Sequence, residues 1–151
     1  MSFDVDKDLN EIAFPSIEDV EEVCYPIACE VFIEEDYRMP GLRGWNKDRM
    51  EAALGAAKNI PDQTIASLGA HLAYYTTKGH AFLDGNKRMT LVILYSFLAV
   101  NDFEMKAPIP VMEVVQFIER VTASKSEEKD IIIKEIENWI IEHFISSNAD
   151  D

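Results

Sequence analysis

Apolar residues recur every three or four positions along most of the chain, and no segment shows the strict alternation of a half-buried strand. This pattern predicts an all-α fold. Proline, glycine and capping residues divide the pattern into segments. The predicted helices run from Ser16 towards Asp36 with a kink at Pro26, from Asn46 past Ala57, from Asp62 to Gly79, from Asn86 to Asn101, from Val111 to Thr122, and from Ser126 to Phe144.

One predicted helix differs from the others because it is apolar on nearly every face. It begins after Asn86 with Met89–Tyr95, and we expect it to be buried at the centre of the molecule. No repeat or linker divides the chain. We therefore predict one domain over residues 16–145, with an N-terminal extension over 1–15 and a frayed polar tail over 146–151.

Charge narrows the possible functions. The chain has 14 basic and 28 acidic residues and a formal net charge of -14, which disfavours nucleic acid as a partner. Between Arg38 and Arg88, however, eight basic residues stand against four acidic ones, a balance that suits a small anion. A chance cluster on a solvated face would give the same count.

The lack of a visible signal peptide and the use of cysteine both indicate a reduced compartment. No signal peptide is visible, and the apolar run Leu91–Val100 is too short to span a bilayer, so we expect a cytoplasmic protein without a membrane partner. Cys24 and Cys29 suit neither a zinc site nor a disulfide framework, and both are interpreted as small buried residues.

The segment Lys78–Arg88 concentrates residues with chemical potential. His80 can accept a proton, and Asp84 can hold Mg2+ against phosphate oxygens. Gly85 allows close approach of a ligand to the backbone, and Asn86, Lys87 and Arg88 begin a helix whose free N–H groups attract anions. These residues suit phosphate transfer. They also allow a structural interpretation, with a core histidine, a capping acid and solvated basic residues.

The sequence His80-Ala81-Phe82-Leu83-Asp84-Gly85-Asn86-Lys87-Arg88 resembles the Fic/Doc signature, His-x-Phe-x-Asp/Glu-x-Asn-small/Lys-Arg. With Lys87 in the next-to-last position it resembles most the Doc (death on curing) toxin branch. Met39–Leu42 is similar to the Pro-Gly loop upstream in Doc-like proteins, and the similarity extends over about residues 16–145.

The resemblance implies a compact helical bundle whose motif loop, ahead of the central helix, binds ATP with Mg2+. It implies a toxin of a toxin–antitoxin system, a serine/threonine kinase-like transferase that moves the terminal phosphate of ATP to a protein hydroxyl. The target class is a translation elongation factor, such as elongation factor Tu, and translation stops. AMP or other NMP transfer is the alternative of the Fic branch, whose second motif arginine is replaced here by Leu91. A second alternative is a catalytically silent Fic-like fold that acts only as a binding module.

The resemblance also assigns roles to single residues. His80 is expected to be the general base and Asp84 the metal ligand or a group that places the base. Gly85, Asn86, Lys87 and Arg88 are expected to bind phosphates, and Lys78 stands where Doc-like proteins often have an arginine near the nucleotide. Some Fic proteins carry an inhibitory helix with the pattern Ser/Thr-x-x-x-Glu followed by Gly or Asn. Ser124–Glu128 matches the first part, but Lys129 follows, so self-inhibition is not predicted. A separate antitoxin is expected instead.

Overall fold

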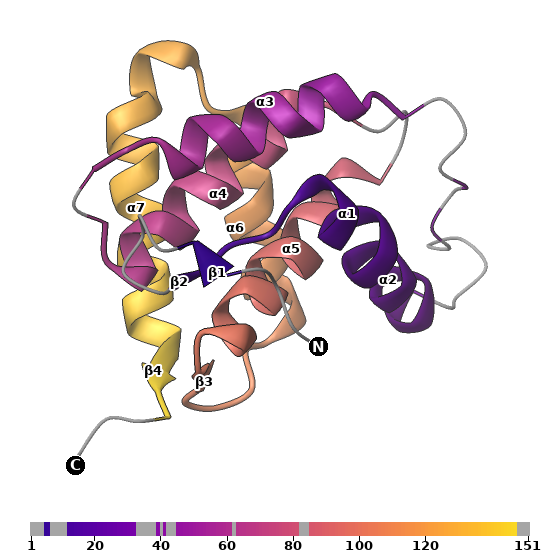
Figure 1. Cartoon of the computed structure of the whole chain (residues 1–151). Helices are drawn as coiled ribbons and strands as arrows, with labels where there is room; N and C mark the ends of the chain where they lie inside the picture. Colours follow the sequence, from indigo (N-terminus) through magenta and orange to yellow (C-terminus); the bar gives the residue numbers. More distant parts are fainter. Residues whose placement is uncertain are drawn as a thin grey trace.

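The computed structural model describes residues 5–6, 12–32, 39, 41, 45–61, 63–81 and 85–147 of the chain. Helices dominate these residues, which confirms the all-α prediction (Figure 1). The long helices are α3 (Lys47–Lys58), α4 (Ile65–Gly79), α5 (Asn86–Val100), α6 (Val111–Ala123) and α7 (Lys129–His143). Over this part of the chain, every helix is too short or too polar to cross a membrane.

The predicted central helix is α5. It packs against α4 on one side and against α2 (Tyr25–Val31) on the other, and it also contacts α6 (Figure 1). Ile93, Leu94, Phe97 and Leu98 of α5 are completely buried. Removing such side chains from water supplies most of the driving force for folding, so α5 is the core around which the other helices are arranged.

Helix α4 is the second main element of the core, because it packs against α3, α5 and α7. At Gly69 the helices approach so closely that an added Cβ would lie 3.2 Å from Ile140 Cδ1 and 3.3 Å from Leu94 Cδ1. Since α4 continues from Gly69 to Gly79, this tight packing helps to position the helix end that precedes His80.

Several predicted helix boundaries are confirmed. Ser16 caps α1 (Ile17–Asp19) in a capping box with Asp19, and Asn46 caps α3 by accepting the N–H of Arg49 at 3.0 Å. Asn101 ends α5, and its side chain bonds both the N–H and the carbonyl oxygen of Ala13. That pair attaches the segment before Ser16 to the end of α5.

Other predicted boundaries were wrong. The first helical segment ends at Val31 and not near Asp36, and a π-helical turn at Val20–Cys24 precedes Pro26. Thr64, whose hydroxyl accepts the N–H of Ser67, caps α4, whereas Asp62 lies outside the described residues. A 3-10 turn at Ser126–Glu128 precedes α7, because the Glu128 carboxylate accepts the N–H of Lys125 at 2.9 Å and tightens the chain there.

Two short antiparallel strand pairs were not predicted. β1 (Val5–Asp6) pairs with β2 (Ile12–Ala13), and β3 (Phe103–Met105) pairs with β4 (Phe144–Ser146). Phe144 is therefore a buried strand residue, although it was predicted to continue the last helix. Strands of two or three residues are too short to produce a recognisable alternation.

The first residues of the predicted C-terminal tail are paired with the chain near Asp102. Ser146, at the start of the predicted tail, pairs with Phe103, and Ser147 donates a hydrogen bond to the carbonyl of Asp102. Residues 148–151 lie outside the described part.

Cys24 is buried as predicted, but Cys29 lies exposed on α2, so the interpretation of both as buried was wrong for Cys29.

Candidate phosphate-transfer site

His80 follows the last residue of α4 and ends that helix. Its φ of 47° places it in the left-handed region, which is uncommon for a residue other than glycine. One turn earlier, the buried hydroxyls of Thr76 and Thr77 each lie 3.3 Å from the hydroxyl of Thr90 on α5. These contacts hold the end of α4 against α5. The helix end before His80 is therefore held in place, whereas His80 itself is exposed.

His80 and the residue after it are also attached to the start of α3. Arg49 donates from Nη1 to the carbonyl of His80 at 3.4 Å, and the N–H of Asn46 donates to the carbonyl of Ala81 at 2.6 Å. Asn46 thereby has two roles, because its side chain caps α3 while its backbone holds the segment after His80. The first turn of α3 therefore helps to position the motif.

Gly85 begins α5 from the other end of the motif. Its φ of 84° is left-handed, and its carbonyl accepts the N–H of Met89 at 2.9 Å as the first helical hydrogen bond. Asn86, Lys87 and Arg88 form the first turn, where backbone N–H groups lack helical partners and the helix dipole is positive. The guanidinium of Arg88 lies 5.9 Å from the centre of the Phe32 ring.

These residues surround one hollow of about 320 Å³. Five of the seven predicted site residues line it, namely His80, Gly85, Asn86, Lys87 and Arg88, and Thr77 and Thr122 complete the lining. The two threonines were not predicted. Thr77 is adjacent to the predicted segment, but nothing in the sequence connects Thr122, on α6, with the motif.

The charge of the hollow suits an anion. Lys87 and Arg88, at a helix N-terminus, line the hollow together with His80. An acidic group lies at its edge, since Glu119 Oε1 of α6 is 3.7 Å from Lys87 Nζ. Both side chains are about half exposed, so this pair is easily separated by a stronger anion such as a phosphate.

The predicted metal ligand Asp84 lies outside the described residues, as do Phe82 and Leu83 of the motif and the basic residues Arg38 and Arg43. Within the described ranges, no three His, Cys, Asp or Glu side chains are grouped closely enough to hold a metal. The expected Mg2+ site therefore stays a prediction that rests on Asp84 together with phosphate oxygens.

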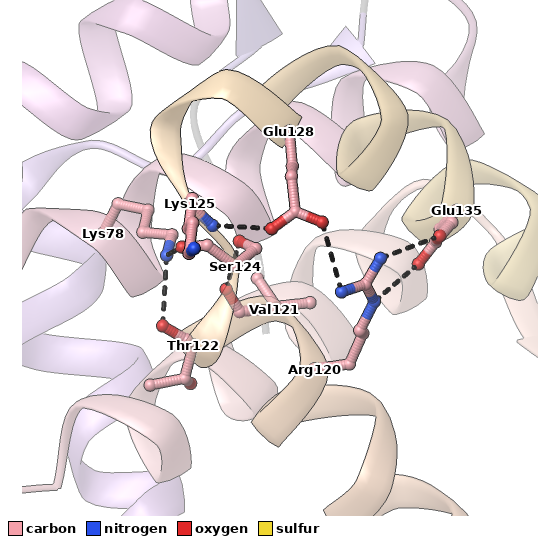
Figure 2. A network of polar contacts seen from close by, with 8 residues as sticks. All are labelled: Lys78, Arg120, Val121, Thr122, Ser124, Lys125, Glu128 and Glu135. Carbon is pink, nitrogen blue, oxygen red and sulfur yellow. Dashed lines mark hydrogen bonds and ion pairs between the residues drawn. The ribbon is translucent and has the colours of Figure 1, made fainter.

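Lys78, the remaining predicted residue, points elsewhere. Its Nζ donates to the carbonyls of Thr122 at 3.1 Å and Ser124 at 2.6 Å, and Lys78 is not among the residues that line the hollow (Figure 2). Its expected contact with the nucleotide stays a prediction, and its described contacts are with the end of α6.

Comparison with known proteins gives one match. No curated protein and no solved structure matches the chain. The family model that matches covers less than half of the chain, from the end of α2 through most of α5. That segment contains α3, α4 and every predicted site residue, but not α6 or α7. Over residues 32–98, the chain is similar to the Fic/DOC family.

Proposed function

We propose that this protein is a Doc-like toxin that transfers the terminal phosphate of ATP to a hydroxyl of a target protein. The observation that carries the proposal is the hollow in which His80 lies beside Gly85, Asn86, Lys87 and Arg88. A proton acceptor next to a cationic helix start suits the transfer of a phosphoryl group to a hydroxyl. The family match supports a Fic-type transferase in general terms.

In the proposed reaction, His80 accepts the proton of the target hydroxyl, and the hydroxyl oxygen forms a bond to the γ-phosphorus. The bond from that phosphorus to the β–γ bridging oxygen breaks, and ADP leaves. Asn86, Lys87 and Arg88 hold the phosphates, so that catalysis consists mainly of positioning and charge stabilisation. When bound, Mg2+ would neutralise phosphate charge, with Asp84 as its protein ligand.

AMP transfer is the second candidate, and one feature favours it. Gly85 corresponds to the Fic form of the loop, whereas Lys87 corresponds to the Doc form. In AMP transfer the same base would direct the hydroxyl to the α-phosphorus and pyrophosphate would leave. The two reactions therefore differ in which phosphorus faces His80.

The deciding experiment supplies ATP labelled at either the α- or the γ-phosphate to the purified protein in a cell lysate with Mg2+. Label from the γ-position on a protein, with a translation elongation factor as the expected target, would support phosphate transfer. Label from the α-position alone would support AMP transfer. Labelling of neither kind, in every lysate tested, would contradict both reactions and favour a binding module.

A cellular experiment tests the proposed toxicity in the bacterial cytoplasm. Expression of the wild-type chain alone is expected to arrest growth, with protein synthesis falling first, whereas His80→Ala and Asp84→Ala at equal abundance are expected to be tolerated. A His80→Ala protein as toxic as wild type would mean that binding, not transfer, is the activity. A harmless wild type would contradict the toxin proposal.

The proposed antitoxin partner has a suitable surface. An apolar groove of about 510 Å³ lies between α2, α5 and α6 and is lined by residues that include Val31, Leu91 and Val115. Val111 is 76% exposed at this groove, and Met112 beside it is 64% exposed. Apolar side chains this accessible are typical of a protein interface. An apolar helix or strand of the antitoxin would cover them.

Substitution of the groove tests this partner. Val111→Glu is expected to abolish relief of growth arrest by a neighbouring-gene antitoxin while leaving the toxicity intact. Ile131→Glu on α7 is the control, because Ile131 is also 60% exposed but does not line the groove. Equal relief of both variants would place the antitoxin elsewhere.

A further inference from the structure

The hollow that contains His80 has a wall outside the part of the chain that matches the family. Thr122 lines the hollow, and Glu119, one turn earlier on α6, pairs with Lys87. The last turn of α6 therefore faces the first turn of α5 across the space proposed for phosphates. Because this turn is the end of a helix, its position depends on how its final carbonyl groups are held.

Lys78 holds two of these carbonyls. It lies in the last turn of α4, two residues before His80, and its half-buried side chain donates to Thr122 and Ser124 (Figure 2). Ser124 closes the same turn, since its hydroxyl donates to the carbonyl of Val121 at 2.7 Å. An ammonium at a helix C-terminus also interacts favourably with the negative end of the helix dipole.

The opposite side of the same helix end is attached differently. Arg120 lies between Glu128 and Glu135, with contacts of 3.4 and 3.3 Å, and these join α6 to the 3-10 turn and to α7 (Figure 2). All three side chains are substantially exposed, so these ion pairs contribute little. The lysine contacts, in contrast, are partly buried and reach the backbone, and they connect α6 directly to the helix that ends at His80.

We propose that Lys78 is a positioning residue that sets the spacing between Thr122 and His80, and not a phosphate ligand. An ammonium has three donors, and two are used by carbonyls. A phosphate that drew the ammonium away from these carbonyls would leave both without this donor, which carries a desolvation cost. This inference rests on the proposed function and assigns a role to a segment that the family match does not include.

The test compares Lys78→Met, Lys78→Arg and Arg120→Met. In Lys78→Met, the end of α6 is expected to fray, so amide hydrogen exchange over residues 120–125 should rise about 10-fold or more. The transfer rate at saturating ATP should fall about 10-fold, whereas the Kd for ATP should change less than about threefold. Lys78→Arg, which can donate to both carbonyls, should restore exchange and transfer.

Arg120→Met is the matched control, because it releases the same turn from its exposed side and leaves the lysine contacts intact. Its transfer rate is expected to stay within about threefold of wild type. Should Lys78→Met fail to fold, Lys78→Gln, which keeps a donor for one carbonyl, is measured instead, with the same direction expected.

Two results would overturn the inference. ATP binding that weakens about 10-fold while exchange over 120–125 stays unchanged would make Lys78 a phosphate ligand. Faster exchange with unchanged transfer would make the contact merely structural. Failure of the proposed reaction is separate, because it appears as wild-type protein that transfers no label. The exchange and binding measurements need no turnover and still show whether Lys78 holds the turn or the phosphate.

Discussion

Gly85 and Met39 approach so closely that a Cβ added to Gly85 would lie 3.0 Å from Met39 Cε. The same Cβ would lie 3.4 Å from Arg88 Nη2, and the φ of 84° is unfavourable for any residue with a Cβ. The glycine thus allows Met39, on the segment before α3, to cover the start of α5 without displacing the guanidinium. This relationship explains a glycine in the centre of the motif.

The first prediction concerns Gly85→Ala. We expect a loss of about 1–2 kcal/mol in the free energy of unfolding, because alanine must adopt the left-handed conformation. ATP binding should weaken as well, since the new methyl group crowds Arg88. Chemical denaturation and calorimetry measure the two effects.

Gly55→Ala is the control for that experiment. Gly55 lies inside α3, with no atom within 4 Å of an added Cβ, so alanine should stabilise the helix by about 0.5–1 kcal/mol. A Gly85→Ala protein as stable as wild type would mean that the backbone at this position relaxes without cost.

The second prediction concerns the proposed base. His80→Ala should reduce transfer about 100-fold or more, because general-base catalysis typically contributes that much. The fold should persist, since the exposed side chain of His80 contributes little to packing. Transfer assays and circular dichroism test both statements. His143→Ala, at the end of α7, is the control and should transfer normally, and near-normal transfer by His80→Ala would remove this residue from the mechanism.

The third prediction concerns the cationic residues of the hollow. Lys87→Ala and Arg88→Ala should each weaken ATP binding by about 1–3 kcal/mol, the range for losing a charged hydrogen-bond partner. Lys47→Ala, whose ammonium pairs with Glu21 at 3.0 Å, should bind ATP normally. Calorimetry with Mg2+ measures the three affinities, and unaltered binding in both site variants would return these residues to the role of a solvated helix start.

The sequence was sufficient to predict the central helix and five residues that line the hollow, because both are local features. Helical periodicity and nearly complete apolarity identify α5, and Gly85 to Arg88 are neighbours at its start. His80 is near them in sequence, so any turn between α4 and α5 brings it close. Predictions from local patterns of this kind are the most reliable ones that a sequence allows.

The sequence was not sufficient for features that depend on distant segments. Thr122 joins the hollow only because α6 packs against α4 and α5, and the contact of Lys78 with Ser124 joins residues 46 positions apart. The exposure of Cys29 also depends on tertiary packing, because the packing of α2 leaves this side chain on the surface. A composition argument could not separate it from Cys24.

The two cysteines provide the last prediction, which concerns stability at alkaline pH. Burial raises the pKa of the Cys24 thiol to about 12, with a smaller opposing effect of a hydrogen bond with Ser96. In the unfolded chain the thiol titrates near its ordinary value of 9.0. Between these values the unfolded state loses a proton that the folded state keeps, so the stability falls as the pH rises.

Thermal unfolding between pH 8 and 11 should therefore show a decline in Tm that begins near pH 9. Cys24→Ala should flatten this first part of the decline, even if its Tm is lower at every pH because a small cavity replaces the sulfur. The half-buried Tyr95, whose hydroxyl is buried and whose pKa is raised to about 12, should maintain a decline that begins above its ordinary value of 10.0. Cys29→Ala, at the exposed position, should retain the wild-type slope.

A Cys24→Ala protein whose Tm falls as steeply as that of the wild type between pH 9 and 10 would contradict this explanation. Among the described residues, no other buried thiol is present to titrate in that interval.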